Sequence, residues 1–270
     1  MNYNFFTVEI TDKVAQVQMN RPAKLNAMGE DFWLEIPQIF ARLDRDPGVR
    51  AVVLSGAGEH FCSGIDLMYL ASLAGQLGQD PGRNALILRD HIKRLQAALE
   101  AVDRCGKPVL AAIQGYCIGG AVDLISACDM RYCSADARFS IKEIDVGMAA
   151  DVGTLQRLPR IIGDGVMREL AYTGRFVEAD EARQIGLVNR VYSDRDSLLQ
   201  EVTQLAGEIA GKSPLAIRGT KEMIRYMRDH DVDDGLNYVA TWNAAMLQSE
   251  DLRVAVAAQM SKKTAEFKDC

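Results

Sequence analysis

The stretch IQGYCIGGAVDLISACDMRYCSADARFSIKEIDVGMAADVGTLQRLP, residues 113–159, decides the fold and much of the chemistry. It places a glycine pair, Gly119-Gly120, where an apolar strand gives way to a helix. It also places three acids, Asp123, Glu143 and Asp151, among residues that otherwise read as core. An unpaired buried carboxylate is costly, so each of these acids requires a partner or a chemical role. Glycine N–H groups beside several acids suit proton transfer next to a developing negative charge.

Upstream of this stretch, short apolar runs alternate with segments of helical periodicity, a pattern typical of a parallel α/β fold. The predicted elements are a hairpin over 5–20, a helix over 29–43, a buried strand over 51–55, a helix over 84–103 and a strand over 109–113. Residues 71–83, rich in glycine, glutamine and alanine, are predicted to be mobile.

From about residue 155 the pattern becomes mostly helical. The candidate helices cover 166–172, 179–185, 197–210, 214–228, 235–248 and 251–263. Ser213-Pro214 is a helix start with proline at the first helical position. We therefore predict an α/β core with the functional site over residues 1–195 and a helical region over residues 196–270.

A second glycine loop, HFCSGIDL at residues 60–67, also follows a predicted buried strand. Glycine lets backbone N–H groups approach a ligand closely, and two such loops at neighbouring strand ends can aim two N–H groups at one oxygen. Either loop alone is explained as well by a tight turn. The pair predicts an oxyanion hole.

The bulk composition excludes several function classes. The chain has 270 residues, 48% of them hydrophobic, a formal net charge of −6 and a sequence pI of about 5.2. With no long Lys/Arg run, nucleic-acid binding is not favoured. No apolar run reaches the length that crosses a bilayer, so no membrane association is expected. The six cysteines include no CxxC pair and there are only three histidines, so no metal site is predicted and the thiols are expected to be reduced.

The residues at the two ends of the sequence bear on the expected cellular compartment. The N-terminal residues alternate like a strand and lack a basic segment followed by an apolar one, as a signal peptide would have. The sequence EFKDC at residues 266–270 differs from a peroxisomal signal. On these grounds we expect a cytoplasmic protein of bacterial origin.

Four motifs together resemble the enoyl-CoA hydratase/isomerase, or crotonase, superfamily over residues 5–260. They are NRPAKLNAM (20–28), HFCSGIDL (60–67), IQGYCIGGAVDL (113–124) and GTLQRLP (153–159). The resemblance implies a crotonase-like (ClpP/crotonase) spiral of ββα repeats with a C-terminal helical trimerisation region. It also implies an acyl-CoA thioester substrate, with coenzyme A as part of the substrate and no metal or redox cofactor. A homotrimer or a homohexamer, formed as a dimer of trimers, is the expected assembly.

The resemblance also assigns binding roles. The N–H groups of Ile65 and Gly120 are expected to hold the thioester oxygen. The residues expected to line the substrate and CoA site are Lys24, Ala27, Cys62, Ser63, Gly64, Ile65, Asp66, Leu67 and Gly120.

The three acids discriminate within the family. Asp123 and Glu143 sit where hydratases carry two catalytic glutamates, and Asp151 falls where they usually have glycine. This combination resembles the Δ3,5-Δ2,4-dienoyl-CoA isomerases of fatty acid β-oxidation. Moving two conjugated double bonds from 3,5 to 2,4 removes a proton at C2 and adds one at C6, a task suited to two separated carboxyl groups. We expect Glu143 at C2 and Asp151 at C6, with the opposite assignment open, and Asp123 as an orienting or proton-holding group.

Two alternatives remain. The nearest is an enoyl-CoA hydratase or a Δ3,Δ2-enoyl-CoA isomerase, disfavoured because Asp123 is one methylene shorter than glutamate and Asp151 adds an acid. The second is a non-catalytic, RNA-binding relative, against which the net charge of −6 argues.

Overall fold

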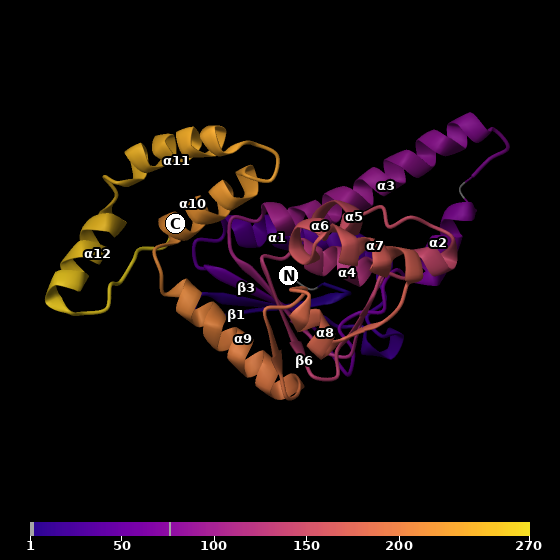
Figure 1. Ribbon diagram of the computed structural model, residues 1–270, viewed down its shortest axis with the longest axis horizontal. Helices are drawn as coiled ribbons and strands as arrows, with labels where there is room; N and C mark the ends of the chain where they lie inside the picture. The colour runs from indigo at the N-terminus through magenta and orange to yellow at the C-terminus, as the bar shows by residue number, and fades with distance from the viewer. Residues whose placement is uncertain (1–2, 76) are drawn as a thin grey trace.

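A computed structural model describes residues 3–75 and 77–270, and its elements confirm the predicted α/β architecture (Figure 1). The strands are β1 (Phe6–Thr11), β2 (Val14–Met19), β3 (Ala51–Gly56), β4 (Val109–Ile113), β5 (Tyr116–Ile118), β6 (Met130–Ser134), β7 (Arg138–Ser140), β8 (Val177–Glu178) and β9 (Arg190–Tyr192). The helices of the first 162 residues are η1 (Pro22–Lys24), α1 (Glu30–Arg45), α2 (Leu67–Ala74), α3 (Pro81–Arg104), α4 (Gly120–Ser126), η2 (Glu143–Val146), α5 (Thr154–Arg157) and α6 (Pro159–Ile162). Those that follow are α7 (Asp164–Thr173), α8 (Ala179–Gln184), α9 (Arg195–Ala210), α10 (Pro214–Tyr226), α11 (Val232–Met246) and α12 (Glu250–Ser261).

The main sheet has six strands in the order β1-β2-β3-β4-β6-β9. Only β1 and β2 pair antiparallel, and the other neighbours are parallel. Asp12 and Lys13 form the tight turn between β1 and β2 with φ of 49° and 67°, as the primed turns of two-residue hairpins require. The hairpin predicted over 5–20 is therefore confirmed.

A second, three-stranded sheet has the order β5-β7-β8, and the glycine pair directly follows its strand β5. β5 pairs parallel with β7, and its last residue, Ile118, directly precedes Gly119. An isolated parallel bridge between Cys62 and Cys117 joins the first glycine loop to β5. The two glycine loops therefore lie side by side.

The centre of the main sheet is covered on both faces, so β3 and β4 are buried along their whole length and mostly apolar. Val52 and Leu54 of β3 face a core that includes Phe32 of α1. Val53, one residue out of phase, faces Leu198 and other residues of α9. Alternation along a strand thus divides the apolar residues between two cores.

The segment 71–83, predicted to be mobile, contains the end of α2 and the start of α3, and its mobility stays a prediction. Residues 71–74 complete α2, and α3 begins at Pro81, three residues earlier than expected. Asp80 caps α3 by accepting from the N–H groups of Gly82 and Arg83. Residue 76 lies outside the described residues.

Helices α10 to α12 extend away from the body at one end of the molecule, while α2 and the first half of α3 project at the other (Figure 1). Helix α9 packs on the sheet. The boundary at residues 195–196 stays a prediction.

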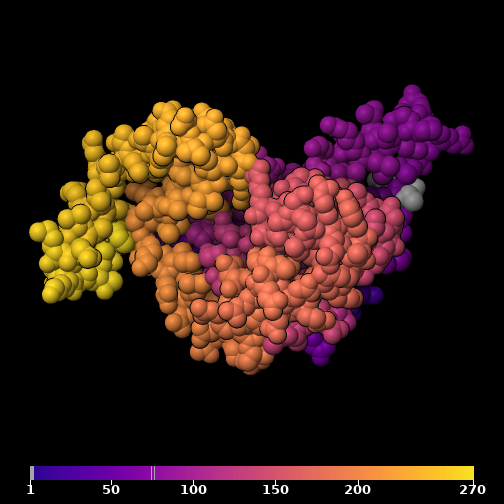
Figure 2. All heavy atoms as spheres, viewed as in Figure 1, coloured from indigo at the N-terminus to yellow at the C-terminus, as the bar shows by residue number. Residues whose placement is uncertain are grey.

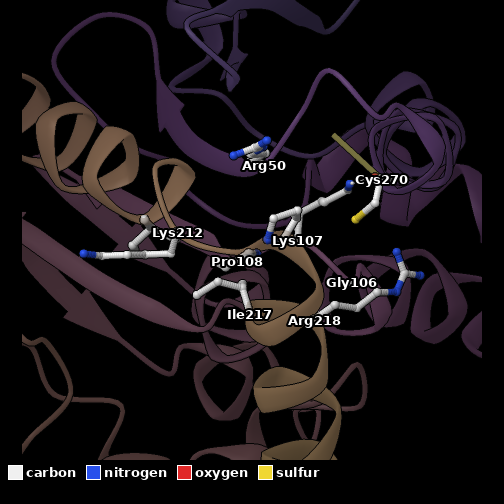
Figure 3. Close-up of a pocket in the computed structure, with 10 residues that line it drawn as sticks. Arg50, Gly106, Lys107, Pro108, Lys212, Ile217, Arg218 and Cys270 are labelled. Carbon is white, nitrogen blue, oxygen red and sulfur yellow. Dashed lines mark hydrogen bonds between the residues drawn. The ribbon is translucent and has the colours of Figure 1, made fainter. Parts of the chain in front are cut away.

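The chain beyond α12 returns to the body. The guanidinium of Arg50, whose side chain is 6% exposed, donates to the Phe267 carbonyl and pairs with Asp269 at 2.7 Å. Nearby, Lys107 Nζ donates to the Cys270 carbonyl at 3.2 Å. Figure 3 shows Arg50, Lys107 and Cys270 around one small, basic pocket.

Candidate active site

Two backbone N–H groups lie next to each other where the glycine loops meet. A Cβ atom built on Gly120 would lie 3.8 Å from Ile65 N. In residues 3–75 and 77–270, no loop or turn hydrogen bond uses either N–H as its donor, and Gly120, the first residue of α4, has no intrahelical acceptor. The structure thus brings the two predicted oxyanion-hole donors together. Because α4 has only seven residues, these two N–H groups, rather than a long helix dipole, are the main local source of positive potential.

Glycine is required at the two positions that precede these donors. Gly64 has φ of +92°, and a Cβ there would lie 2.6 Å from the Ile118 carbonyl oxygen. Gly119 has φ of +56°, and its N–H donates to the Ser140 carbonyl at 2.9 Å. A side chain at either position would force the two loops apart or strain the backbone.

Asn26 and Arg21 hold the first loop in place, and sequence reasoning missed both. Asn26 is fully buried with φ of 53°, and its Nδ2 donates to the carbonyls of Ala57, His60 and Phe61. Its Oδ1 accepts from Arg21 N at 2.9 Å. The signal for Asn26 was its residue type, because asparagine tolerates the left-handed region and bonds to nearby backbone groups. No comparable sequence signal marks Arg21, which pairs with Asp66 at 2.7 Å.

The loop predicted to contact CoA from residues 24–27 lies against residues 62–67. Ser63 N donates to the Leu25 carbonyl, and Met28 N donates to the Gly64 carbonyl. Lys24 is exposed at the end of η1, while Ala27 is half-buried. The structure brings the two segments together, and their contact with CoA stays a prediction.

Three residues of the predicted CoA loop differ in accessibility. Burial raises the pKa of the Cys62 thiol to about 12, and its Sγ lies 3.0 Å from the Asn26 carbonyl oxygen, so this thiol supports the loop. Asp66 caps α2, and the Arg21 guanidinium lowers the pKa of its carboxyl. Leu67 is 64% exposed.

Asp123 is the most deeply buried of the three acids, with no exposed surface. Its Oδ1 accepts from Thr154 N at 2.5 Å, and its Oδ2 is buried with no hydrogen-bond partner among the described residues. Burial, followed by the charge of Glu143, raises the pKa of Asp123 to about 7. Near neutral pH this carboxyl therefore exists in both protonation states.

Glu143 begins η2 and reaches towards the glycine pair. Its Oε1 lies 3.3 Å from a Cβ built on Gly119, and its Oε2 is buried without a partner in the described part of the chain. Burial raises the pKa of this carboxyl above its ordinary value. A proton acceptor thus lies beside the oxyanion-hole loop.

Asp151 is half-buried in the loop before α5. Gln96 of α3 fixes its backbone, because the Gln96 Nε2 donates to the Asp151 carbonyl at 2.6 Å. Burial raises the pKa of the Asp151 side chain. The charge of Asp151 acts on both Asp123 and Glu143, so the structure gathers all three predicted acids in one electrostatically coupled group.

Sequence reasoning missed Thr154 and Gln96, which hold Asp123 and Asp151. Both contacts run between a side chain and a backbone group far away in the sequence, 31 and 55 residues respectively. No local pattern encodes such pairs.

The described residues contain no group of three or more histidine, cysteine, aspartate or glutamate side chains arranged to hold a metal ion. None of the helices in residues 3–75 and 77–270 combines the length and apolar character needed to cross a bilayer.

Comparison with known proteins gives a family and several relatives. A family described as enoyl-CoA hydratase/isomerase matches residues 9–270. The peroxisomal Delta(3,5)-Delta(2,4)-dienoyl-CoA isomerase of Arabidopsis thaliana is 51% identical, covering 98% of each chain. The mitochondrial enzyme of the same name from Rattus norvegicus is 50% identical, covering 97% of this chain and 82% of its own. Among solved structures, the enoyl-CoA hydratase from Bacillus anthracis superposes with a TM-score of 0.89 at 30% identity, covering 98% of this chain and 99% of its own.

These relatives contradict the expectation of a cytoplasmic, bacterial protein, because they are peroxisomal and mitochondrial proteins of eukaryotes. The expectation failed for a physical reason. A compartment is addressed by short segments that receptors read, and these are separate from the folded body. One fold can therefore serve in several compartments.

Proposed function

The chain belongs to the enoyl-CoA hydratase/isomerase family and has its crotonase-like fold, and we propose that it isomerises 3,5-dienoyl-CoA to 2,4-dienoyl-CoA. The names of its half-identical relatives support this reaction. The observation that carries the proposal is the third acid. Asp151 acts electrostatically on Asp123 and Glu143, and Glu143 lies beside the glycine pair, so two separate carboxyl groups are available for a two-site proton shift.

The proposed reaction begins when the Glu143 carboxylate removes a proton from C2. The electron pair of the broken C–H bond moves into the conjugated system, and the negative charge develops on the thioester oxygen. The N–H groups of Ile65 and Gly120 stabilise that oxyanion. Protonated Asp151 then donates to C6, which completes the 2,4-diene with no net change in protons.

Each turnover exchanges the protonation states of the two carboxyl groups, so a proton has to return from Glu143 to Asp151. Asp123 is suited to assist this return, because it interacts electrostatically with both acids and has a pKa raised to about 7. A group whose pKa lies near the working pH both accepts and releases a proton readily. We assign Asp123 this proton-holding role.

The thioester and its CoA moiety are proposed to lie along residues 24–27 and 62–67, with coenzyme A entering as part of the substrate. The steps above use only carboxyl and N–H groups of the chain. They call on no metal or redox cofactor.

We also propose that the protein assembles as a homotrimer, with two trimers forming a hexamer. Helices α10 to α12 expose many large apolar side chains, including Ile224, Val232, Leu236, Leu247 and Met260. Between α10 and the body lies a hollow of about 520 Å³, and Figure 2 shows the molecule indented there. Exposed apolar surface of this extent is typical of an interface.

The test of the reaction is a kinetic comparison of 3,5-octadienoyl-CoA with a 2-enoyl-CoA of equal length. We expect a conjugated 2,4-dienoyl thioester to appear from the first substrate, and hydration of the second to be slower. Turnover of the 2-enoyl substrate alone would identify a hydratase instead.

Isotope exchange in deuterated water tests the roles of the acids. We expect Glu143→Gln to lose exchange at C2, and Asp151→Asn to retain exchange at C2 but lose incorporation at C6. Each variant should lower kcat at least about 100-fold, as loss of a positioned proton-transfer group typically does. Full C2 exchange in Glu143→Gln would refute the role of Glu143.

A further inference from the structure

A cluster of polar side chains lies between α2 and α3 near Asp151, and the reaction above leaves it without a role. Arg94 Nη2 lies 3.1 Å from His91 Nδ1, and both residues belong to α3. The Tyr69 hydroxyl of α2 lies 3.5 Å from His91 Nε2 and from Arg94 Nη2. Tyr69 is 9% exposed, so the cluster is partly withdrawn from water.

The contact between Arg94 and His91 fixes the state of the imidazole. A guanidinium has only donors, so His91 Nδ1 has to accept the hydrogen bond and cannot itself carry a proton. The imidazole is then neutral and carries its proton on Nε2, the nitrogen that faces the Tyr69 hydroxyl. A proton on both nitrogens would break this contact and place two cations side by side.

The same helix contacts Asp151. Gln96, five residues beyond His91 in α3, donates from Nε2 to the Asp151 carbonyl at 2.6 Å. His91 and Asp151 also interact electrostatically, each acting on the titration of the other. Helix α3 therefore fixes the backbone of Asp151 and carries a titratable ring whose charge acts on the Asp151 carboxyl.

We propose that Arg94 and His91 are positioning residues for Asp151, in which Arg94 holds His91 neutral so that the proton these two groups compete for stays on the Asp151 carboxyl. The inference rests on the role of Asp151 as proton donor to C6. It adds an interaction that keeps the Asp151 carboxyl protonated.

The charged groups that act on His91 are Arg94, Glu30 and Asp151, and their effects on its pKa agree with the proposed role of Arg94. Arg94 lowers the pKa of His91, as does burial, which is the larger cause. Glu30, at the start of α1, and Asp151 oppose them. Without Arg94 only burial would oppose the two acids, so the pKa of His91 would rise. A larger share of His91 would then be protonated, and its positive charge would favour the Asp151 carboxylate, which has no proton to give to C6.

The kinetic test is a double-variant series of Arg94→Met, His91→Gln and the combination of both. We expect Arg94→Met to lower kcat about 3- to 10-fold between pH 6 and 7, because His91 gains a proton in the range where histidines titrate. Glutamine cannot take that proton, so the combined variant should match His91→Gln within about twofold. Arg89→Met, which removes an exposed arginine from the same helix, is the matched control and should match the wild type.

Two kinetic outcomes overturn the inference. One is an Arg94→Met variant as active as the wild type. The other is a combined variant whose kcat lies below that of His91→Gln by the same factor by which the kcat of Arg94→Met lies below that of the wild type. The second result would mean that Arg94 acts on packing or substrate binding rather than through His91.

An NMR titration of protein labelled with 13C-histidine tests the tautomer separately from the reaction. The chain has three histidines, so the spectrum of His91→Gln assigns the His91 signals. We expect the Cδ2 shift of His91 to report a proton on Nε2, and its titration midpoint to rise in Arg94→Met. A proton on Nδ1 in the wild type would overturn the inference even if the enzyme isomerises dienoyl-CoA. Wild-type protein inactive on that substrate would instead refute the proposed function.

Discussion

The buried carboxyl of Asp123, to which we assign a proton-holding role, lowers the stability of the fold at neutral pH. Its pKa rises from an ordinary value of 3.8 to about 7 in the folded chain, chiefly through burial. Between these two values the folded protein binds a proton that the unfolded chain has released. Stability therefore falls as pH rises through this window, and the loss is complete above pH 7.

We predict that Asp123→Asn is more stable than the wild type above neutral pH. Asparagine keeps an Oδ1 acceptor for Thr154 N but has no charge to desolvate. The gain should reach at most about 4 kcal/mol at pH 8, with little gain near pH 4, because the pKa rises by about three units and each unit corresponds to about 1.4 kcal/mol. Denaturant unfolding at pH 4, 6 and 8 measures it, and activity should fall in the same variant.

Asp103→Asn is the matched control for this prediction. Asp103 accepts 2.7 Å hydrogen bonds from Arg228 on both carboxylate oxygens, so its neutralisation should destabilise the protein. Opposite signs for the two substitutions would show that burial, and not charge removal in general, governs Asp123. A loss of stability in Asp123→Asn at pH 8 would contradict the argument.

At the residue scale, the grouping of the three acids was predictable and the residues that hold them in place were not. Asp123, Glu143 and Asp151 stood out because acids are unusual in apolar surroundings. Thr154, Gln96 and Asn26 did not, because their contacts join side chains to distant backbone groups that only the tertiary fold brings near.

At the scale of elements, the site depends on how closely two loops approach. We predict that Gly64→Ala lowers kcat at least about 100-fold, because loss of one oxyanion-hole donor has effects of this size. The new methyl would meet the Ile118 carbonyl oxygen and displace the Ile65 N–H from Gly120. Steady-state kinetics with circular dichroism as a fold check measures the effect.

Gly207→Ala is the control for this substitution. Gly207 lies in α9 with open space around it, so alanine should stabilise the helix by about 0.5–1 kcal/mol and leave turnover unchanged. A Gly64→Ala variant with normal kcat would show that Ile65 does not hold the thioester oxygen.

Element prediction succeeded for elements with a clear period and missed two of the shortest strands. The β1–β2 hairpin and α1 have clear periods and were found within two residues of their ends. Strands β8 and β9, of two and three residues, lie in the region predicted to be mostly helical. Such short strands form because a neighbouring strand pairs with them, a property absent from their own sequence.

At the scale of the whole molecule, the C-terminal helices expose large apolar side chains, which we propose to be buried in a trimer. We predict that Ile224→Asp combined with Leu236→Asp raises the dissociation constant of the trimer at least about 100-fold, because each buried charge would lack a partner. These side chains are 64% and 60% exposed in the single chain. Sedimentation velocity over a concentration series measures the change.

Leu86→Asp provides the matched control, since Leu86 is also 64% exposed but lies on the part of α3 that projects at the opposite end. It should sediment like the wild type. Unchanged assembly in the double variant would show that these helices are not the trimer interface, and a monomeric wild type would refute the assembly altogether.

The buried guanidinium of Arg50 also sets an order of events during synthesis. Its acceptors, the carbonyls of Ala210 and Phe267 and the carboxylate of Asp269, follow it by 160 to 219 residues. A nascent chain whose sheet strands have all left the ribosome therefore still carries a cation beside the sheet without its partners. Partly folded chains of this kind are the usual clients of chaperones. Synthesis therefore has to pass Asp269 before the Arg50 guanidinium beside the sheet has all of its acceptors, and this segment acts as a late check on folding.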